Sequence, residues 1–382
     1  MLNIYEKALE LLEAGRRVAF AVVVHATGST PQKPGAKALF EPSGPVHGTL
    51  GGGCLEAEAR QRAFRALDSE QPLVFDLKLD EVDGWDDGLV CGGRVRIFVD
   101  PNVSRNAAAY RMAFAAQARG AAGVLVLVIE HPDHAPGTAL WLDGDALHSG
   151  PKEHAQHDTL GGDSPPASPA SHVSFAEPLR QEIAALLSRE QAGLVRVPPH
   201  NGTSGIEVFV EPVLPPPRLV IAGAGHIGKA LARLGAWLGF HVTLIDDRPS
   251  FAHAAHVPDA HTILCGDIAE ELQHLPLDAR TYVVIVTRGH RHDGQALAAC
   301  IHAPVAYLGL IGSKRKSLLL RRRLLADGLA SEEEVARVVS PMGLDIGGTS
   351  VEEIALSIAA QLVAVRRRKT LEAAPLALPL TP

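Results

Sequence analysis

The sequence predicts an α/β protein in two parts, with an N-terminal mixed α/β domain followed by a domain built on a doubly wound parallel sheet. The chain has 382 residues, which is more than one domain usually contains. Four prolines between Pro212 and Pro217 mark a boundary. After this boundary, short apolar runs alternate with helical patterns, which is typical of parallel βαβ units.

Composition sets the expected boundaries. We expect an N-terminal domain over residues 1–211, a stiff linker over 212–217 and a second domain over 218–370. Residues 371–382 are expected to be a disordered tail. Between about 150 and 172 the chain is rich in Pro, Ser, Gly, Asp and His, which predicts a flexible insertion without packed structure.

The composition also excludes several functional classes. Apolar residues make up 46% of the chain, and the net charge of −7 gives no basic balance for nucleic acid. No apolar run reaches the roughly 18 residues of a membrane span. Residues 1–17 have the pattern of an amphipathic helix rather than a signal peptide.

Cysteine usage indicates free thiols. The four cysteines lie far apart and none belongs to a C-x-x-C pair, so we expect neither a structural zinc site nor a disulfide framework. Free thiols without an export signal indicate the cytoplasm. Cys265 ends an apolar strand and Cys300 lies in an apolar helix, so both are expected to pack as small hydrophobic residues.

The first domain is predicted to mix helices and strands. Continuous apolar runs with β-branched residues predict buried strands, and spacings of three and four predict helices. The expected helices are 4–14, 55–67, 106–119 and 175–187, and the expected strands are 18–24, 38–40, 46–48, 73–79, 95–99, 123–130, 138–142, 195–197 and 206–210.

Two Cys–Gly clusters are the candidate functional residues of this domain. Gly51, Gly52 and Gly53 leave the backbone bare before a helix, where N–H groups can cradle an anion and lower the pKa of the Cys54 thiol. Cys54 is therefore a candidate reactive thiolate or a metal or sulfur ligand, and the alternative is a tight turn around a small buried residue. Cys91, before two glycines, is the second candidate. The sequence leaves open whether the two thiols meet.

The second domain opens with a strand, a glycine turn and a helix. Gly223, Gly225 and Gly228, with His226 between them, form G-x-G-x-x-G. The first glycine allows the turn, the second lets a phosphate approach the backbone, and the third lets the helix pack on the strand. Asp246 ends the next strand, about 20 residues further on, where an acid can accept hydrogen bonds from ribose. These five residues are candidate cofactor ligands of a Rossmann-like domain. The alternative is a turn that binds nothing.

Polar residues follow the apolar strand 282–287. Arg288 is a candidate cofactor ligand and His290 a candidate acid–base residue, because the carboxyl ends of parallel strands present ligand groups. His290 and His292 with Asp293 are also potential metal ligands. Three ligands without a fourth favour a polar rim or a helix cap instead, and the metal stays unknown.

A third glycine turn has a basic character. Gly312 precedes Ser313, which suits an N-cap, and Lys314 opens a helix with further basic residues. Lysine and arginine oppose the helix dipole there, which an anionic ligand or partner would explain. Gly312, Ser313 and Lys314 are therefore candidate cofactor ligands, and a solvated basic face is the alternative.

Together these stretches resemble the XdhC/CoxI family, the accessory factors of molybdenum-containing xanthine and carbon monoxide dehydrogenases. The motifs stand in family order across nearly the whole chain, although residues 150–172 have no counterpart. They are Thr27-Gly28-Ser29, Pro34-Gly35-Ala36, Gly51-Gly52-Gly53-Cys54 with Glu56, Cys91-Gly92-Gly93, Gly223 to Gly228, Arg288-Gly289-His290 with Asp293, Gly309 to Ser313 with Lys316, and Pro341 to Gly347.

The resemblance implies a cytoplasmic maturation chaperone rather than a catalyst. Such a factor binds molybdenum cofactor (molybdopterin), assists its sulfuration and inserts it into an apo xanthine dehydrogenase-type molybdoenzyme. A cysteine desulfurase and further copies of the same chain, as a homo-oligomer, are the other expected partners. An anion cradle for the pterin phosphate and a soft thiolate near the metal agree in kind with this cofactor.

Two alternatives remain at this point. An NAD(P)-dependent oxidoreductase would hold NAD(P) or another dinucleotide at the glycine turn and use His290 in proton transfer, although no partner acid is evident. A docking protein would have lost its ligand, but Asp246 favours a nucleotide. The sequence does not identify the client enzyme.

Overall fold

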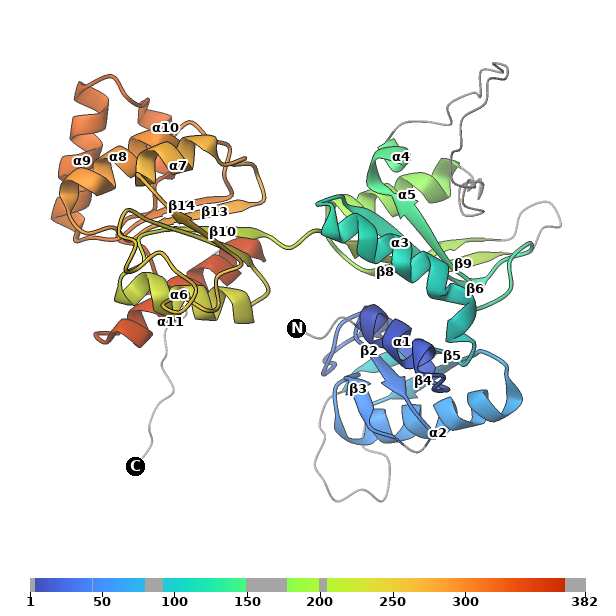
Figure 1. Ribbon diagram of the computed structural model, residues 1–382. Coiled ribbons are helices and arrows are strands. Elements are labelled where there is room, and N and C mark those ends of the chain that lie inside the picture. Colours follow the sequence, from blue (N-terminus) through green and yellow to red (C-terminus); the bar gives the residue numbers. More distant parts are fainter. Residues whose placement is uncertain (1–3, 43, 80–91, 149–176, 199–204, 368–382) are drawn as a thin grey trace, which may run out of the picture. The chain divides into compact units, whose positions relative to one another are not determined.

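The chain divides into two compact units, one over Leu2–Pro215 and one from Pro216 onwards (Figure 1). The computed structural model describes residues 4–42, 44–79, 92–148, 177–198 and 205–367. The predicted insertion at 150–172, the predicted tail at 371–382 and Cys91 lie outside the described residues. Within the described part of the chain, no helix has the length and apolar character needed to cross a membrane.

The N-terminal unit contains two antiparallel sheets with the strand orders β3-β2-β1-β5-β4 and β7-β6-β9-β8 (Figure 1). Its elements are α1 (Ile4–Glu13), β1 (Ala19–Thr27), β2 (Lys37–Phe40), β3 (Val46–Gly48), α2 (Gly53–Ser69), β4 (Leu73–Lys78), β5 (Arg94–Asp100), a 3₁₀ turn (Val103–Asn106), α3 (Ala107–Ala118), β6 (Gly123–Glu130), β7 (Ala139–Asp143), α4 (Gly144–His148), α5 (Glu177–Ser188), β8 (Gly193–Val197) and β9 (Ile206–Val213). The predicted mixed α/β character is confirmed.

Strand β1 shows why its run is continuously apolar. Phe20 and Val22 pack with α1, α3 and the second sheet, whereas Ala21 and Val23 pack on the opposite face with α2. A strand that is covered on both faces has no polar side to alternate with. Helices α1 and α3 thus lie between the sheets, while α2 and α5 cover their outer faces.

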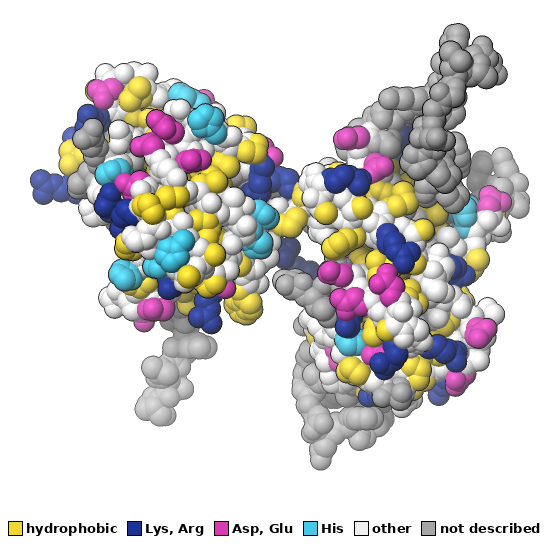
Figure 2. Space-filling model, in the orientation of Figure 1, with side chains coloured by type: hydrophobic (Ala, Val, Ile, Leu, Met, Phe, Trp, Pro, Cys, Tyr) yellow, Lys and Arg dark blue, Asp and Glu magenta, His cyan; other side chains and the backbone are white. Residues whose placement is uncertain are grey.

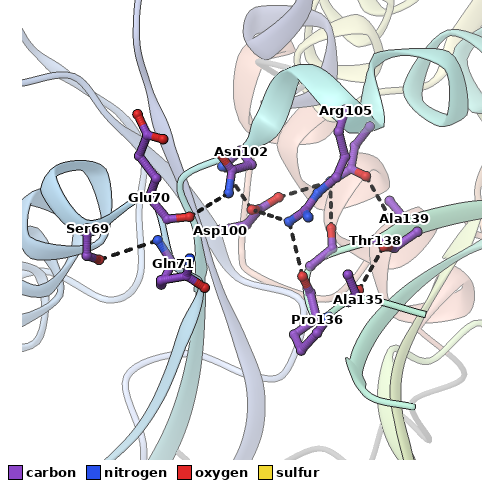
Figure 3. A network of polar contacts seen from close by, with 12 residues as sticks. Ser69, Glu70, Gln71, Asp100, Asn102, Arg105, Ala135, Pro136, Thr138 and Ala139 are labelled. Carbon is purple, nitrogen blue, oxygen red and sulfur yellow. Dashed lines mark hydrogen bonds and ion pairs between the residues drawn. The ribbon is translucent and has the colours of Figure 1, made fainter. Parts of the chain in front are cut away.

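A buried polar junction joins the two sheets of this unit. Asp100, fully buried at the end of β5, accepts hydrogen bonds from Asn106 at 3.0 Å and from Arg105 at 3.1 Å. The same two side chains donate to the carbonyls of Gly137 and Pro136 in the turn between β6 and β7 (Figure 3). Burial raises the pKa of Asp100 despite these donors.

The C-terminal unit is the predicted doubly wound parallel sheet, with the order β12-β11-β10-β13-β14. Helices α6 and α11 pack on one face, and α7, α8, α9 and α10 pack on the other. Its elements are β10 (Arg218–Ala222), α6 (His226–Trp237), β11 (His241–Asp246), β12 (Thr262–Cys265), α7 (Ile268–His274), β13 (Thr281–Ile285), α8 (His290–Cys300), β14 (Tyr307–Leu310), α9 (Lys314–Ala326), α10 (Glu332–Arg337) and α11 (Val351–Arg366). The direction of winding reverses between β10 and β13, where such folds bind ligands.

Two local predictions were wrong. Strand β9 continues to Val213, so the first two residues of the predicted linker belong to a strand, and Pro212 lies opposite Val124. Strand β8 pairs with β9 only as far as Val210, so beyond this residue β9 has a neighbouring strand on one side only. A proline is tolerated there because its missing N–H leaves no hydrogen bond of the sheet unmade on the free side. Cys265 is exposed because it ends β12, which lies at the edge of its sheet. Cys300 is buried as predicted, and burial raises the pKa of its thiol to about 12.

Candidate functional site

The glycine turn of the C-terminal unit joins β10 to α6 at the reversal point of the sheet. An added Cβ at Gly223 would stand 2.6 Å from the Val286 carbonyl oxygen, and one at Gly228 would stand 1.9 Å from the Gly223 oxygen. Packing therefore requires the first and third glycines. Gly225 has nothing within 4 Å of an added Cβ, and as the N-cap residue of α6 it makes no side-chain capping hydrogen bond. The backbone at Gly225 is open to a ligand, next to the exposed His226.

Asp246 is bonded within the protein. Its carboxylate accepts the backbone N–H of Ala224 at 2.7 Å, the backbone N–H of Arg248 at 3.0 Å, and two guanidinium hydrogen bonds from Arg248, both at 2.8 Å. Burial by itself raises the pKa of Asp246, but the donors from Arg248 and Ala224 outweigh it and hold the pKa below its usual value. The residue predicted to bind ribose thus pairs with Arg248 and also accepts a hydrogen bond from the backbone of the glycine turn.

Arg288 follows β13 and is also paired. Its guanidinium donates to Asp247 at 2.8 Å, and Asp247 lies 3.9 Å from the Arg248 side chain. The Arg288 side chain is 55% exposed, so its ion pair with Asp247 lies at the protein surface and contributes little to the stability of the fold.

The sequence did not predict a buried ion pair at the same edge of the sheet. Asp293 is fully buried in α8, where it accepts the Thr287 hydroxyl at 2.7 Å and pairs with the ammonium group of Lys316 in α9. The lysine stem crosses Gly312, whose added Cβ would stand 2.7 Å from Lys316 Cδ. Gly312 therefore gives the lysine room to reach Asp293.

This pair bears on the metal question. Asp293 was considered as a metal ligand with His290 and His292, whereas the structure gives it a lysine as counter-ion. Among the described residues, no group of three His, Cys, Asp or Glu side chains is arranged to hold a metal ion. The sequence signal that could have suggested the pair is Lys316 at the start of a helix, three residues after Ser313.

Helix α9 has an amphipathic surface with basic and apolar residues side by side. Ser313 is its N-cap, as predicted, and accepts the backbone N–H of Lys316 at 3.3 Å. On the outer face Leu318 and Leu319 are 54% and 58% exposed, near the exposed Arg315 and Arg322. Figure 2 shows Lys and Arg side chains at the edge of the C-terminal unit where Figure 1 places α9. This face is suited to an acidic partner.

In the N-terminal unit, a carboxylate of the chain occupies the turn at Gly51–Gly53. Glu56 accepts the Thr49 hydroxyl and the backbone N–H groups of Leu50 at 3.1 Å and Gly52 at 3.0 Å. Burial raises the pKa of Glu56, but the hydrogen bonds from Thr49 and the backbone outweigh it, and the pKa lies below its usual value. The predicted anion cradle thus already contains an anion.

Three glycine-rich turns meet in this unit. An added Cβ at Gly28 would stand 3.1 Å from Gly93 Cα, and one at Gly93 would stand 2.3 Å from the Ser29 oxygen. At Gly51 an added Cβ would stand 2.8 Å from Pro31 Cβ. The loop from Gly28 to Pro31 is therefore flanked by the glycines of both Cys–Gly clusters.

For the thiols of these two clusters, the structure gives only the positions of neighbouring residues in the chain. Cys54 is the second residue of α2, and Gly93 follows Cys91 by two positions. Cys91 is outside the described residues, and the side chains of Cys54, His290 and Lys314 are not among those that the structure describes. His290 and Lys314 begin α8 and α9. The convergence of the two thiols stays a prediction.

These features define a two-unit α/β protein with a Rossmann-like unit and a glycine-rich, cysteine-bearing N-terminal unit. Residues 219–362 match the XdhC Rossmann domain, and residues 11–77 match the XdhC and CoxI family. The two matches together cover more than half of the chain, which belongs to the XdhC and CoxI family.

Several known proteins are similar to the chain. A protein of Bacillus subtilis, described as a probable subunit of xanthine dehydrogenase, is 26% identical over 94% of this chain and 96% of its own length. The molybdenum cofactor insertion chaperone PaoD of Escherichia coli is 23% identical over 94% of this chain and 86% of its own. A crystal structure of a Bacillus halodurans protein, described as a xanthine dehydrogenase, has a TM-score of 0.71 at 23% identity and covers 98% of both chains. This last likeness shows that the fold is shared.

Proposed function

We propose that this protein is an accessory factor that binds molybdenum cofactor and passes it to an apo-molybdoenzyme of the xanthine dehydrogenase type. The observation that carries the proposal is the similarity to a molybdenum cofactor insertion chaperone over 94% of the chain. Family membership and the similarity to a probable subunit of xanthine dehydrogenase support the same type of client.

The turn at Gly225 is the proposed position of the pterin phosphate. Its backbone is accessible, the 12-residue helix α6 begins next to it, and Gly225, the N-cap residue, has no side chain that could cap the helix. The uncapped N–H groups and the helix dipole favour an anion at this position. Thr287, whose Cα would lie 3.2 Å from an added Cβ at Gly223, borders the turn.

The experiment that tests this function is cofactor binding and transfer with the variant Gly225→Val. Gly225 has a φ of −65° and open space around it, so we expect the variant to fold, while its side chain blocks the approach of the phosphate. Molybdenum and pterin retained by the purified protein, and client activity after reconstitution, should both fall at least about ten-fold.

Arg233→Ala serves as the control, because Arg233 is an exposed residue further along α6. It should retain and transfer cofactor like the wild type. Normal loading of Gly225→Val would refute the phosphate position, and a wild-type protein that never binds pterin would refute the function itself.

The finer proposal is that Cys54 takes part in sulfuration, with a cysteine desulfurase as the sulfur donor. Its position in the first turn of α2, next to the meeting point of three glycine-rich turns, supports access by a large ligand. Cys54→Ser should keep the fold and the bound pterin but lower the activity of the reconstituted client. Equal client activity with wild type and Cys54→Ser would remove Cys54 from the process.

The outer face of α9 is the proposed docking surface for the client, which would present an acidic surface to it. Arg315→Glu combined with Arg322→Glu, two exposed residues of this face, should reduce capture of the apo-enzyme in a pull-down, while cofactor binding is kept. The matched control combines Arg119→Glu with Arg189→Glu, two exposed residues of the N-terminal unit. Equal capture by both double variants would show that the outer face of α9 is a solvated surface that does not bind the client. Light scattering of the same samples tests the expected homo-oligomer.

A further inference from the structure

The segment after β11 occupies the position where a Rossmann fold binds ribose. A carboxylate offers about four acceptor positions. Asp246 receives four hydrogen bonds, one from Ala224 and three from Arg248, and its side chain is only 2% exposed. The two hydroxyl groups of a ribose would have to displace the Arg248 guanidinium to reach this carboxylate.

Further contacts hold Arg248 in place. Its guanidinium carbon lies 3.7 Å from the centre of the Phe251 ring, within the range of a cation–π contact. The Phe251 ring meets His256 edge-on at 5.0 Å, and His256 Nε2 lies 3.0 Å from the Ala224 carbonyl oxygen. Ala224 is thus held through its N–H by Asp246 and through its carbonyl by His256.

The pairing of Arg248 with Asp246 is strong because its two hydrogen bonds are charged and parallel. A guanidinium and a carboxylate that form two parallel, charged hydrogen bonds are oriented before any ligand arrives. A neutral ribose diol offers two uncharged donors in exchange, and neutral hydrogen bonds are weaker than charged ones. The exchange is therefore unfavourable for any ligand that places an adenosine with free ribose hydroxyl groups beside the turn.

We propose that Arg248 is a specificity-determining residue that closes the ribose position of the Rossmann unit and excludes NAD and other ligands whose adenosine ribose carries free hydroxyl groups. The turn at Gly225 stays open to a phosphate on this account, because the Arg248 guanidinium bonds Asp246 and an added Cβ at Gly225 has nothing within 4 Å. The inference goes beyond the proposed function and does not depend on it, since it concerns only ligands with an adenosine.

Calorimetric titration of the full chain with ADP-ribose and NAD tests the proposal. The wild type should bind neither of them below a Kd of about 1 mM. Arg248→Ala should bind ADP-ribose at least about ten-fold more tightly than the wild type, because Asp246 is then free to accept the ribose hydroxyls. Arg248→Ala with Asp246→Asn should lose this gain, and Arg233→Ala should behave as the wild type.

Micromolar binding of either ligand to the wild type would overturn the proposal. The same holds if Arg248→Ala, with a native circular dichroism spectrum, binds ADP-ribose no better than the wild type. If Arg248→Ala does not fold, Arg248→Lys is titrated instead, because it keeps the charge without the planar fork; it should bind ADP-ribose more tightly than the wild type, and no gain would overturn the proposal. None of these titrations contains molybdenum cofactor, so their failure is distinguishable from failure of the proposed function.

Discussion

Lys316 and Asp293 form a buried ion pair that joins α9 to α8 at the carboxyl end of the Rossmann sheet. The carboxylate is fully buried, and Lys316 is 17% exposed. Removal of one partner from a buried ion pair leaves an uncompensated charge, which costs roughly 3–5 kcal/mol. We therefore predict that Lys316→Met lowers the free energy of unfolding by about this amount, measured by urea denaturation.

A second substitution separates the charge from the packing. Asp293→Asn in the Lys316→Met background removes the buried charge and keeps an acceptor for the Thr287 hydroxyl, so most of the lost stability should return. If the double variant is as unstable as Lys316→Met, the lysine stem that crosses Gly312 matters more than its charge.

At the scale of single elements, the N-terminus of α10 should be sensitive to acid. The backbone N–H of Ser331, the His302 side chain and the Ser331 hydroxyl lower the pKa of Glu334 from 4.5 to about 2. A lowered pKa in the folded state stabilises the protein above pH 4.5, and this contribution is lost as the pH falls from 4.5 towards 2.

Ser331→Ala removes the hydroxyl of this capping box. We predict that the variant loses less stability than the wild type between pH 4.5 and pH 2, as followed by urea denaturation at a series of pH values. Parallel pH profiles of the two proteins would contradict the assigned role of Glu334.

Elements were more predictable than the contacts between them. The run from Leu219 to Ala222 and the glycine turn after it predicted the first βαβ unit, because local spacing decides strand, turn and helix. The order of the strands within the two N-terminal sheets was not predictable, because strands such as β1 and β5 pair although they lie far apart in the sequence. Likewise, Glu56 in its own glycine turn and Lys316 against Asp293 are contacts that periodicity does not encode.

The whole molecule consists of two units with separate hydrophobic clusters, which meet in the sequence at Pro215 and Pro216. We predict that residues 216–367 fold when expressed alone, because the sheet and its covering helices all lie within this range. A native-like circular dichroism spectrum and a cooperative urea transition would support this, and a molten or aggregated product would contradict it.

The division at the prolines has a consequence for how binding can be observed. We expect the two separate cores to unfold as two cooperative systems, so that no single melting temperature describes this chain. A ligand that binds one folded unit stabilises that unit alone, by about 2.7 kcal/mol at a hundred times its Kd. In a calorimetric scan, the heat-absorption peak that moves when cofactor is added would therefore identify the unit that carries it, without a single substitution.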